Sequence, residues 1–408
     1  MGSIFVRHNP LSVPIKILGA LKISKTLLLS AFFYFLACVD LIQVFNVRPL
    51  MLLPLCYVLI QILRARRTPL DLYYVIAFVA ACIPSIYFSQ NIVQSAAYLI
   101  WPLFNFFSIF CAFYFLAKSS LKNTLLGIIW CSRIQIVLAF ILWFLGLQPR
   151  AHLFFFEPSY FAISLAFYVT WVFVGSRNNL SSKKWDYFLI FLALISTAAA
   201  MLMLTLLVVT TLVLLVSIKR LRFFVLFAMI TIISGVASTY YVNKSDSLLA
   251  NSISALASAP SNLDVLLSRS GNRWPRIKLA KDVFVSNPIG VGVGAYEEHA
   301  TQEFYPKHRY REWWLDPYGK PAVNIFLEIG ATCGWAALFI WIIWMIRLLL
   351  TSHRHWSMSE IYFLYLLVLL SLFMVESNYL RPYIWAIFGV IAGLKSNRST
   401  NAEIETRA

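Results

Sequence analysis

Three arginines in a long polar segment are the residues of this sequence best suited to bind a phosphate group. Arg269, Arg273 and Arg276 are spaced i, i+4 and i+7, so on one helix their guanidinium groups would project from the same face. A guanidinium group matches phosphate oxygens through two parallel hydrogen bonds. The segment that carries them, residues 242–320, contains ten of the 34 basic residues. We predict that this row binds a diphosphate; the alternative is a helix that anchors the segment to a membrane surface.

Pro275 limits where such a helix begins, because proline fits the first turn of a helix but not its interior. A start near Arg273 keeps Arg273 and Arg276 on the helix. Arg269 would then precede it.

Two further polar groups flank apolar stretches of the chain. Glu157, Pro158 and Ser159 stand at the entry to one stretch, where a carboxylate, a proline and a hydroxyl are also typical of a helix start. Asn324 and Glu328 lie four residues apart, so they share one face of the stretch after the polar segment. Polar groups at that depth cost free energy unless they are paired or used.

The glycines of the polar segment resemble a phosphate-binding loop only superficially. Gly290, Gly292 and Gly294 lack the spacing of a nucleotide-binding loop and the strand–helix–strand context that such a loop needs. A turn or a close backbone contact explains them, and the alternative is a set of backbone amides that face an anion.

Acidic residues and histidines also gather in the polar segment. Their spacing is not diagnostic of a metal site. A solvated surface explains them, and the alternatives are a general base for a sugar hydroxyl or a metal site. The residues are Glu297, Glu298, His299, Glu303 and His308.

Outside the polar segment the chain is apolar enough for a membrane protein. Apolar residues make up 60% of the 408 residues and charged residues only 12%, proportions that exclude an ordinary soluble domain. A helical span needs ~20 apolar residues. We therefore predict an all-α polytopic membrane protein with about twelve spans, near 26–45, 49–63, 69–88, 94–117, 124–146, 160–176, 185–199, 201–217, 223–241, 321–347, 359–377 and 382–394.

The distribution of lysine and arginine predicts the orientation of these spans. Basic residues concentrate in the termini and in every second turn, which places both termini in the cytoplasm and the polar segment outside. The opposite turns hold only Arg48, Arg150 and Arg381. The predicted organisation is a membrane bundle (1–241), a large outer loop with short helices (242–320), further membrane helices (321–394) and a cytoplasmic tail (395–408).

The net charge of +17 follows from the same distribution, because cytoplasmic basic residues bind anionic lipid. It does not indicate nucleic-acid binding. Arg133 is an exception in the middle of a predicted span, where an unpaired guanidinium is costly. Pairing with Gln135 or Asp40, a contact with the path of a lipid diphosphate, or a different span boundary would each explain it.

Taken together, these motifs resemble those of the Wzy-type O-antigen and exopolysaccharide polymerases, which are more distantly similar to the O-antigen ligases. The resemblance covers most of the chain. Three stretches carry it, and their order around one large outer loop makes them more specific together than alone. They are Glu157-Pro158-Ser159-Tyr160-Phe161-Ala162, then Ser270-Gly271-Asn272-Arg273 with Asn287-Pro288-Ile289-Gly290-Val291-Gly292, and finally Asn324, Glu328, Gly330 and Gly334. Many members of the wider group, ligases especially, have histidine before this asparagine, whereas Val323 stands here, which favours polymerase over ligase.

The resemblance implies a GT-C-like glycosyltransferase of the bacterial inner membrane that uses undecaprenyl-pyrophosphate-linked glycans as donor and acceptor. The implied reaction inverts the anomeric carbon and needs neither metal nor cofactor. Arg269, Arg273 and Arg276 would stabilise the departing diphosphate, and Glu157 or His299 would accept the hydroxyl proton. The residues that would position substrate or loops are Ser159, Tyr160, Gly290, Gly292, Asn324 and Glu328.

Three functions remain open at this point. The favoured one is polymerisation of repeat units into O-antigen or a related polysaccharide, with membrane lipids and a chain-length regulator as further partners. A ligase that transfers polymer to a lipid A core is the second. A flippase for lipid-linked oligosaccharide is the third.

Overall fold

A computed structural model describes residues 24–41, 48–65, 68–175, 184–216, 273–305, 316–354, 356–377 and 379–394. Within these ranges the chain forms helices and turns and contains no strand, which confirms the predicted all-helical class for this part of the protein. Arg269, the predicted span 223–241 and both terminal segments lie outside the described residues.

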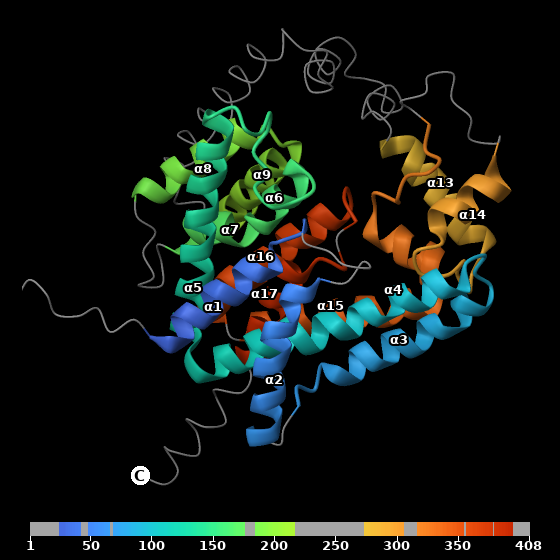
Figure 1. The fold of residues 1–408 in the computed structure, drawn as a ribbon, viewed down its shortest axis with the longest axis horizontal. Coiled ribbons are helices and arrows are strands. Elements are labelled where there is room, and N and C mark those ends of the chain that lie inside the picture. The colour runs from blue at the N-terminus through green and yellow to red at the C-terminus, as the bar shows by residue number, and fades with distance from the viewer. Residues whose placement is uncertain are drawn as a thin grey trace, which may run out of the picture.

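The helices fall into two groups along the sequence (Figure 1). The first group is α1 (Lys25–Ala37), η1 (Pro49–Met51), α2 (Leu52–Ala65), α3 (Leu72–Tyr87), α4 (Ile92–Asn105), the π-helical turn η2 (Phe106–Phe110), α5 (Cys111–Phe144), α6 (Pro158–Ser164), α7 (Ala166–Val174), α8 (Lys184–Thr197) and α9 (Ala200–Val216). The second group is α13 (Arg273–Ser286), α14 (Tyr296–Phe304), α15 (Ile325–Arg354), α16 (Trp356–Phe373) and α17 (Pro382–Leu394).

Two helical stretches are long and apolar enough to cross a membrane by length and composition, Ile92–Phe144 and Ile325–His353. The other apolar helices contain 10–17 residues, fewer than the ~20 that a span through the hydrocarbon core requires. Their positions coincide with predicted spans. The number of twelve spans stays a prediction.

Ser120 divides α5 into two helices of different direction (Figure 1). Its backbone is extended, with φ −164° and ψ 98°, and its hydroxyl accepts a hydrogen bond from the Asn123 amide at 3.4 Å. Serine is favoured at a helix N-cap because its side-chain oxygen satisfies an amide that the helix leaves free. The chain therefore turns where the sequence predicts a connection between two spans.

Helix α15 joins several of the elements that surround the site (Figure 1). It packs against α3, α13, α16 and α17. Its Trp341 and Trp344 are buried with ring centroids 5.4 Å apart, and Trp344 lies 5.3 Å from Trp385 of α17. Large aromatic rings bury much apolar area with few rotatable bonds. This cluster holds α15 in place, and the N-terminal end of α15 carries part of the site described below.

Arg133 of α5 is paired inside the bundle, which confirms one of the three predicted explanations, but its partner is Asp186 of α8 and not Gln135 or Asp40. The guanidinium Nε and Nη2 donate to the two carboxylate oxygens at 2.8 and 3.0 Å, and the Tyr168 hydroxyl donates to the same carboxylate at 2.7 Å. Buried charges are tolerated when they are paired and hydrogen-bonded. Asp186 was not predicted as the partner because the spacing of residues in the sequence does not show which helices are neighbours.

Candidate functional site

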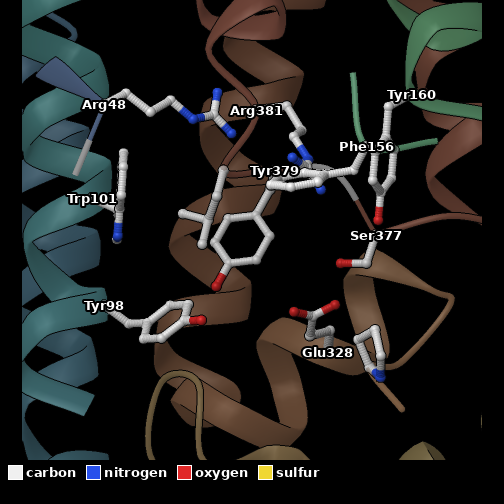
Figure 2. A pocket seen from close by; sticks show the side chains of 11 residues that line it. Arg48, Tyr98, Trp101, Phe156, Tyr160, Glu328, Ser377, Tyr379 and Arg381 are labelled. Atoms are coloured by element: carbon white, nitrogen blue, oxygen red, sulfur yellow. The ribbon is translucent and has the colours of Figure 1, made fainter. Parts of the chain in front are cut away.

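A cavity of about 260 Å³ collects side chains from five separate parts of the chain (Figure 2). Aromatic rings form much of its wall, and polar groups occupy its ends. Its lining consists of Arg48, Tyr98, Trp101, Phe156, Tyr160, Pro321, Glu328, Ser377, Tyr379, Leu380 and Arg381. A concave site with mostly aromatic walls and a few convergent polar groups is typical of small-molecule binding.

Two arginines at one end of the cavity share a single buried carboxylate. Arg48 lies directly before η1, and Arg381 directly before α17. Asp40, which is fully buried, forms ion pairs with both: one of its carboxylate oxygens lies 2.8 Å from Arg48 Nη2, and the other accepts a hydrogen bond from Arg381 Nη1 at 3.0 Å. Two positive charges therefore face one negative charge, which leaves one positive charge without a counter-ion in this group.

The Arg48 guanidinium also keeps unused donors. Its side chain is only 7% exposed, and its Nε and Nη1 have no hydrogen-bond partner among the described residues. Burial lowers the pKa of Arg48, and Asp40 only partly offsets this because Arg381 adds a second positive charge. Unsatisfied buried donors and surplus charge both favour an anion at this end of the cavity.

Tyr160, which the sequence assigns to positioning, stacks against one of these arginines. The Arg381 guanidinium carbon lies 3.8 Å from the centroid of the Tyr160 ring, a cation–π contact. Because Tyr160 lies in α6 and Arg381 before α17, the contact joins two separate parts of the cavity wall.

Glu328 lies at the other end of the cavity from Arg48 and Arg381, with the Tyr379 ring in view between them (Figure 2). It stands in the first turn of α15. Asn324 fixes that turn, because its side-chain oxygen accepts the amides of Phe326 and Leu327 at 3.0 Å each. The Asn324 amide group in turn donates to the Met374 carbonyl at 3.1 Å. Asn324 therefore acts as a helix cap and ties α15 to the α16–α17 connection.

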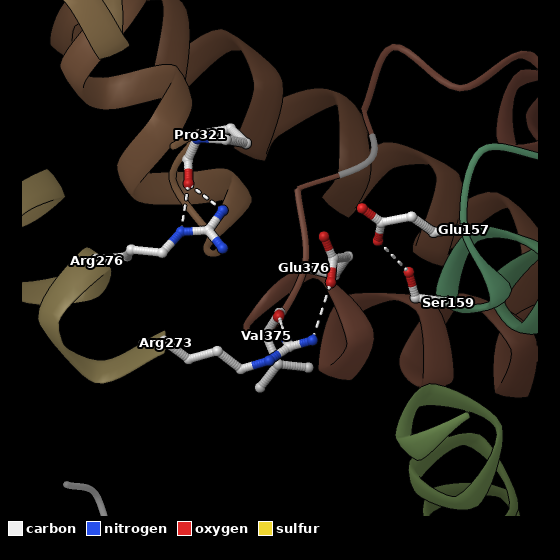
Figure 3. A network of polar contacts seen from close by, with 7 residues as sticks. All are labelled: Glu157, Ser159, Arg273, Arg276, Pro321, Val375 and Glu376. Carbon is white, nitrogen blue, oxygen red and sulfur yellow. Dashed lines mark hydrogen bonds and ion pairs between the residues drawn. The ribbon is translucent and has the colours of Figure 1, made fainter. Parts of the chain in front are cut away.

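Arg273 and Arg276 hold the walls of the cavity rather than lining it (Figure 3). Arg273 donates to the Val375 carbonyl, and its Nη2 lies 3.2 Å from the Glu376 carboxylate. Arg276 donates through Nε to the Pro321 carbonyl at 2.7 Å, and Pro321 belongs to the cavity wall. The structure thus brings both arginines to the rim. Arg269 lies outside the described residues.

Glu157 and Ser159 lie beside this rim (Figure 3). The Glu157 side chain is exposed and accepts the Ser159 hydroxyl at 3.0 Å. Pro158 begins α6, so the pair also stands at a helix start, as the local sequence indicates. Glu157 does not line the cavity, although Phe156 and Tyr160 on either side of it do.

The glycine-rich stretch packs its backbone against a break in α15. Gly334 of that helix has φ +85°, and the amides of Val291 and Gly292 donate to the Ala331 and Thr332 carbonyls at 2.9 and 3.0 Å. A Cβ on Gly290 would lie 2.5 Å from the Thr332 carbonyl oxygen, so glycine permits the approach. These amides are used by the protein itself, and the stretch positions α13 and α14 beside α15.

His299 of α14 is buried away from the cavity. Its Nε2 lies 3.4 Å from the Asn287 amide nitrogen and 3.7 Å from the Glu303 carboxylate. Burial lowers the pKa of His299, and Glu303 opposes this shift. The imidazole therefore favours its neutral form, but it is not among the residues that line the cavity.

The sequence held a signal for the two arginines that the prediction missed. Arg48, Arg150 and Arg381 are the exceptions to the charge rule in the short turns. Arg150 donates to the Thr197 and Ala198 carbonyls at the end of α8, where a cation is favoured by the helix dipole. Arg48 and Arg381 instead line the cavity, so two of the three exceptions to the predicted charge distribution belong to the candidate site.

Comparison with known proteins bears on the part of the chain that includes this rim. Residues 187–342 match the family described as O-Antigen ligase (Wzy_C). The match supports the O-antigen ligase and polymerase superfamily, and with it a membrane protein. It includes Arg273, Arg276, Asn324 and Glu328 but ends before Arg381 and begins after Tyr160. A comparison with curated proteins found no match.

Proposed function

We propose that this protein is a glycosyltransferase that joins lipid-diphosphate-linked oligosaccharide repeat units into O-antigen or a related surface polysaccharide. The observation that carries the proposal is the cavity, which has two arginines sharing one aspartate at one end and a carboxyl group at the other. The match to the O-Antigen ligase family supports the same substrate class. In the proposed reaction the anomeric carbon is inverted.

The charges of the cavity suit the departure of a diphosphate. As the bond between the sugar C1 and the phosphate oxygen breaks, negative charge develops on the diphosphate. Arg48 and Arg381 would stabilise that charge inside the cavity, and guanidinium groups do so without a metal ion. Arg273 and Arg276 hold the rim and are candidates for contact with the same diphosphate as it enters.

The aromatic wall suits the glycan. Trp101, Phe156 and Tyr379 present ring faces or edges to the cavity, and such rings pack against the apolar faces of sugars while hydroxyl groups reach polar neighbours. Glu157 and His299 are the residues that the family resemblance implies as acceptors for the proton of the attacking hydroxyl. A further carboxyl group is considered below.

The proposed site faces the outer side of the membrane. Arg48, Phe156, Pro321 and Arg381 come from connections that the charge rule assigns to one side, opposite the basic turns. Four connections predicted to share a face therefore converge on one cavity, which supports the predicted orientation. With both termini in the cytoplasm, that face is the periplasmic face of the inner membrane.

A ligase that transfers finished polymer to a lipid A core is the second candidate, because the family match carries that name. Val323 before Asn324 favours the polymerase, since many ligases have histidine there. The two functions use the same donor and differ in the acceptor, so the acceptor separates them.

Reconstitution of the purified full chain in lipid nanodiscs tests the proposal. With a synthetic undecaprenyl-diphosphate repeat unit as the sole glycan, a polymerase makes a ladder of products on the lipid diphosphate. A ligase makes no ladder and transfers glycan only when lipid A core is added. The absence of both products would overturn the proposal, and transfer to lipid A core without a ladder would favour the ligase. In a producing strain, loss of the polymerase should leave lipopolysaccharide with a single repeat unit.

A further inference from the structure

Glu328 is the cavity carboxyl group that no cation engages among the described residues. Two other carboxylates beside the cavity are paired with cations: Asp40 contacts two arginines, and Glu376 contacts Arg273. Glu328 has no such ion pair, and its Oε2 is buried without a hydrogen-bond partner in the described part of the chain. A half-buried carboxyl group that faces a cavity and has one buried oxygen without a partner is costly unless it has a use.

The backbone holds this side chain in a fixed place. Glu328 lies in the first turn of α15, its amide donates to the Asn324 carbonyl at 2.9 Å, and its own carbonyl accepts the Thr332 hydroxyl at 2.6 Å. The N-terminal end of a helix also favours a negatively charged side chain. The position of the carboxyl group is therefore set before any ligand binds.

The opposite end of the cavity holds the two arginines (Figure 2). In a displacement that inverts the anomeric carbon, the attacking hydroxyl and the leaving diphosphate stand on opposite sides of the sugar. A general base must reach the attacking hydroxyl. A sugar held between the two ends would turn its diphosphate toward Arg48 and Arg381 and its other face toward Glu328.

We propose that Glu328 is the general base that accepts the proton of the acceptor hydroxyl, an inference that rests on the proposed glycosyltransferase function. The hydroxyl oxygen forms its bond to C1 of the donor sugar as its proton passes to the Glu328 carboxylate. The bond between C1 and the phosphate oxygen breaks, and its electron pair leaves with the lipid diphosphate. Glu328 then releases the proton to water. Neighbouring Ser377, whose hydroxyl shares this part of the cavity, helps to orient the carboxylate.

Glutamine at this position keeps the shape but cannot accept the proton. In the nanodisc assay, Glu328→Gln should lower kcat at least about 100-fold, within the range for removal of a general base, with the donor KM within about threefold of wild type. Glu328→Asp keeps a carboxylate and should retain at least about ten times the activity of Glu328→Gln. The matched control is Glu298→Gln, an exposed glutamate of α14, which should leave kcat unchanged.

A pH profile separates a base from a merely structural group. Wild-type kcat should fall at acidic pH as the base gains a proton, and Glu328→Gln should lose this limb of the profile. If Glu328→Gln does not fold, Glu328→Asp carries the test, because a displaced carboxylate should alter the acidic limb while donor binding is kept.

The outcomes distinguish this inference from the function on which it rests. A wild-type chain that transfers no glycan overturns the proposed function, and this inference with it. An active wild type with Glu328→Gln within about threefold of it overturns the base assignment alone. The assignment also fails if Glu157→Gln, rather than Glu328→Gln, removes the acidic limb and the activity.

Discussion

Two groups of arginines, each around a buried aspartate, differ in the contacts that their guanidinium groups make. Between α5 and α8, Arg133 engages both carboxylate oxygens of Asp186, and Tyr168 adds a further hydrogen bond. At the cavity, Arg48 and Arg381 share Asp40 and leave donors of Arg48 unused. In the part of the chain that the structure describes, the guanidinium of the first group has acceptors, whereas the second group has more guanidinium donors than acceptors.

The difference gives a physical criterion for separating structural from binding arginines. A guanidinium with its full complement of acceptors has no free donor for a ligand, and removing its partner leaves an uncompensated charge. A surplus guanidinium beside a cavity is stabilised further when an anion arrives. The two groups should therefore respond to mutation in opposite ways, one in stability and the other in ligand binding.

The largest effect should follow from breaking the balanced pair. Arg133→Ala leaves Asp186 buried without its cation, and such a loss costs about 3–5 kcal/mol of folding stability. Thermal unfolding in detergent should show a much lower midpoint, or little folded protein. The double variant Arg133→Met with Asp186→Leu removes both charges and should recover most of the loss.

Activity supplies the control for this pair. Any folded Arg133→Met, Asp186→Leu protein should polymerise at close to the wild-type rate per molecule. A double variant that is stable but inactive would show that the pair belongs to the substrate path, and the proposed distinction would fail.

Removing a cavity arginine should instead spare stability and lower affinity. Arg381→Ala leaves Asp40 with Arg48, a balanced pair, so the unfolding midpoint should change little. Binding of a synthetic undecaprenyl diphosphate should weaken about 10- to 100-fold, the range for loss of a hydrogen bond to a charged group. Arg381→Lys should lie between, because lysine lacks the planar fork and the stacking on Tyr160.

Arg64→Ala, at an exposed site near the end of α2, is the matched control and should bind the lipid as wild type does. Asp40→Asn should have effects opposite to those of Arg381→Ala. It should lower the stability without weakening the binding of the diphosphate, since it leaves two guanidinium groups without a counter-ion. If Arg381→Ala lowers stability as much as Arg133→Ala, the surplus charge is not a property of the folded protein.

Much of the fold could be predicted from the sequence because long apolar stretches indicate membrane helices directly. A helix follows Ser120, where the apolar composition predicts one, and α6 begins at Pro158, where the local sequence predicts a helix start. The partners of buried charges could not be predicted. Several acidic residues could pair with Arg133 as long as the packing of the helices is unknown. Only the contact between α5 and α8 identifies Asp186 as the partner.

The site was predictable in part for the same reason. Asn324 and Glu328 were found because a spacing of four residues places them on one helix face, and Tyr160 because it belongs to a stretch that resembles the polymerases. Arg48 and Arg381 stand 333 positions apart in the chain, and no local pattern joins them. Their joint contact with Asp40 depends on tertiary packing, although the charge rule already marks each as an exception.

Mutation of Arg273 at the cavity rim should have the smallest effect, and it adds a third kind of arginine contact to the comparison. Arg273 is about one-third exposed and contacts Glu376 and the Val375 carbonyl, so it fastens the α16–α17 connection that carries Arg381. Arg273→Ala should lower activity about tenfold and change stability by less than about 1 kcal/mol, as expected for a partly solvated pair. Glu376→Gln should have a similar effect, and the double variant should be no worse than either alone because the two act as one contact. Two results would contradict this: additive losses in the double variant, or a loss of lipid diphosphate binding in Arg273→Ala as large as in Arg381→Ala. Either would mean that Arg273 leaves Glu376 and binds the diphosphate itself, as the spacing of the arginine row predicts.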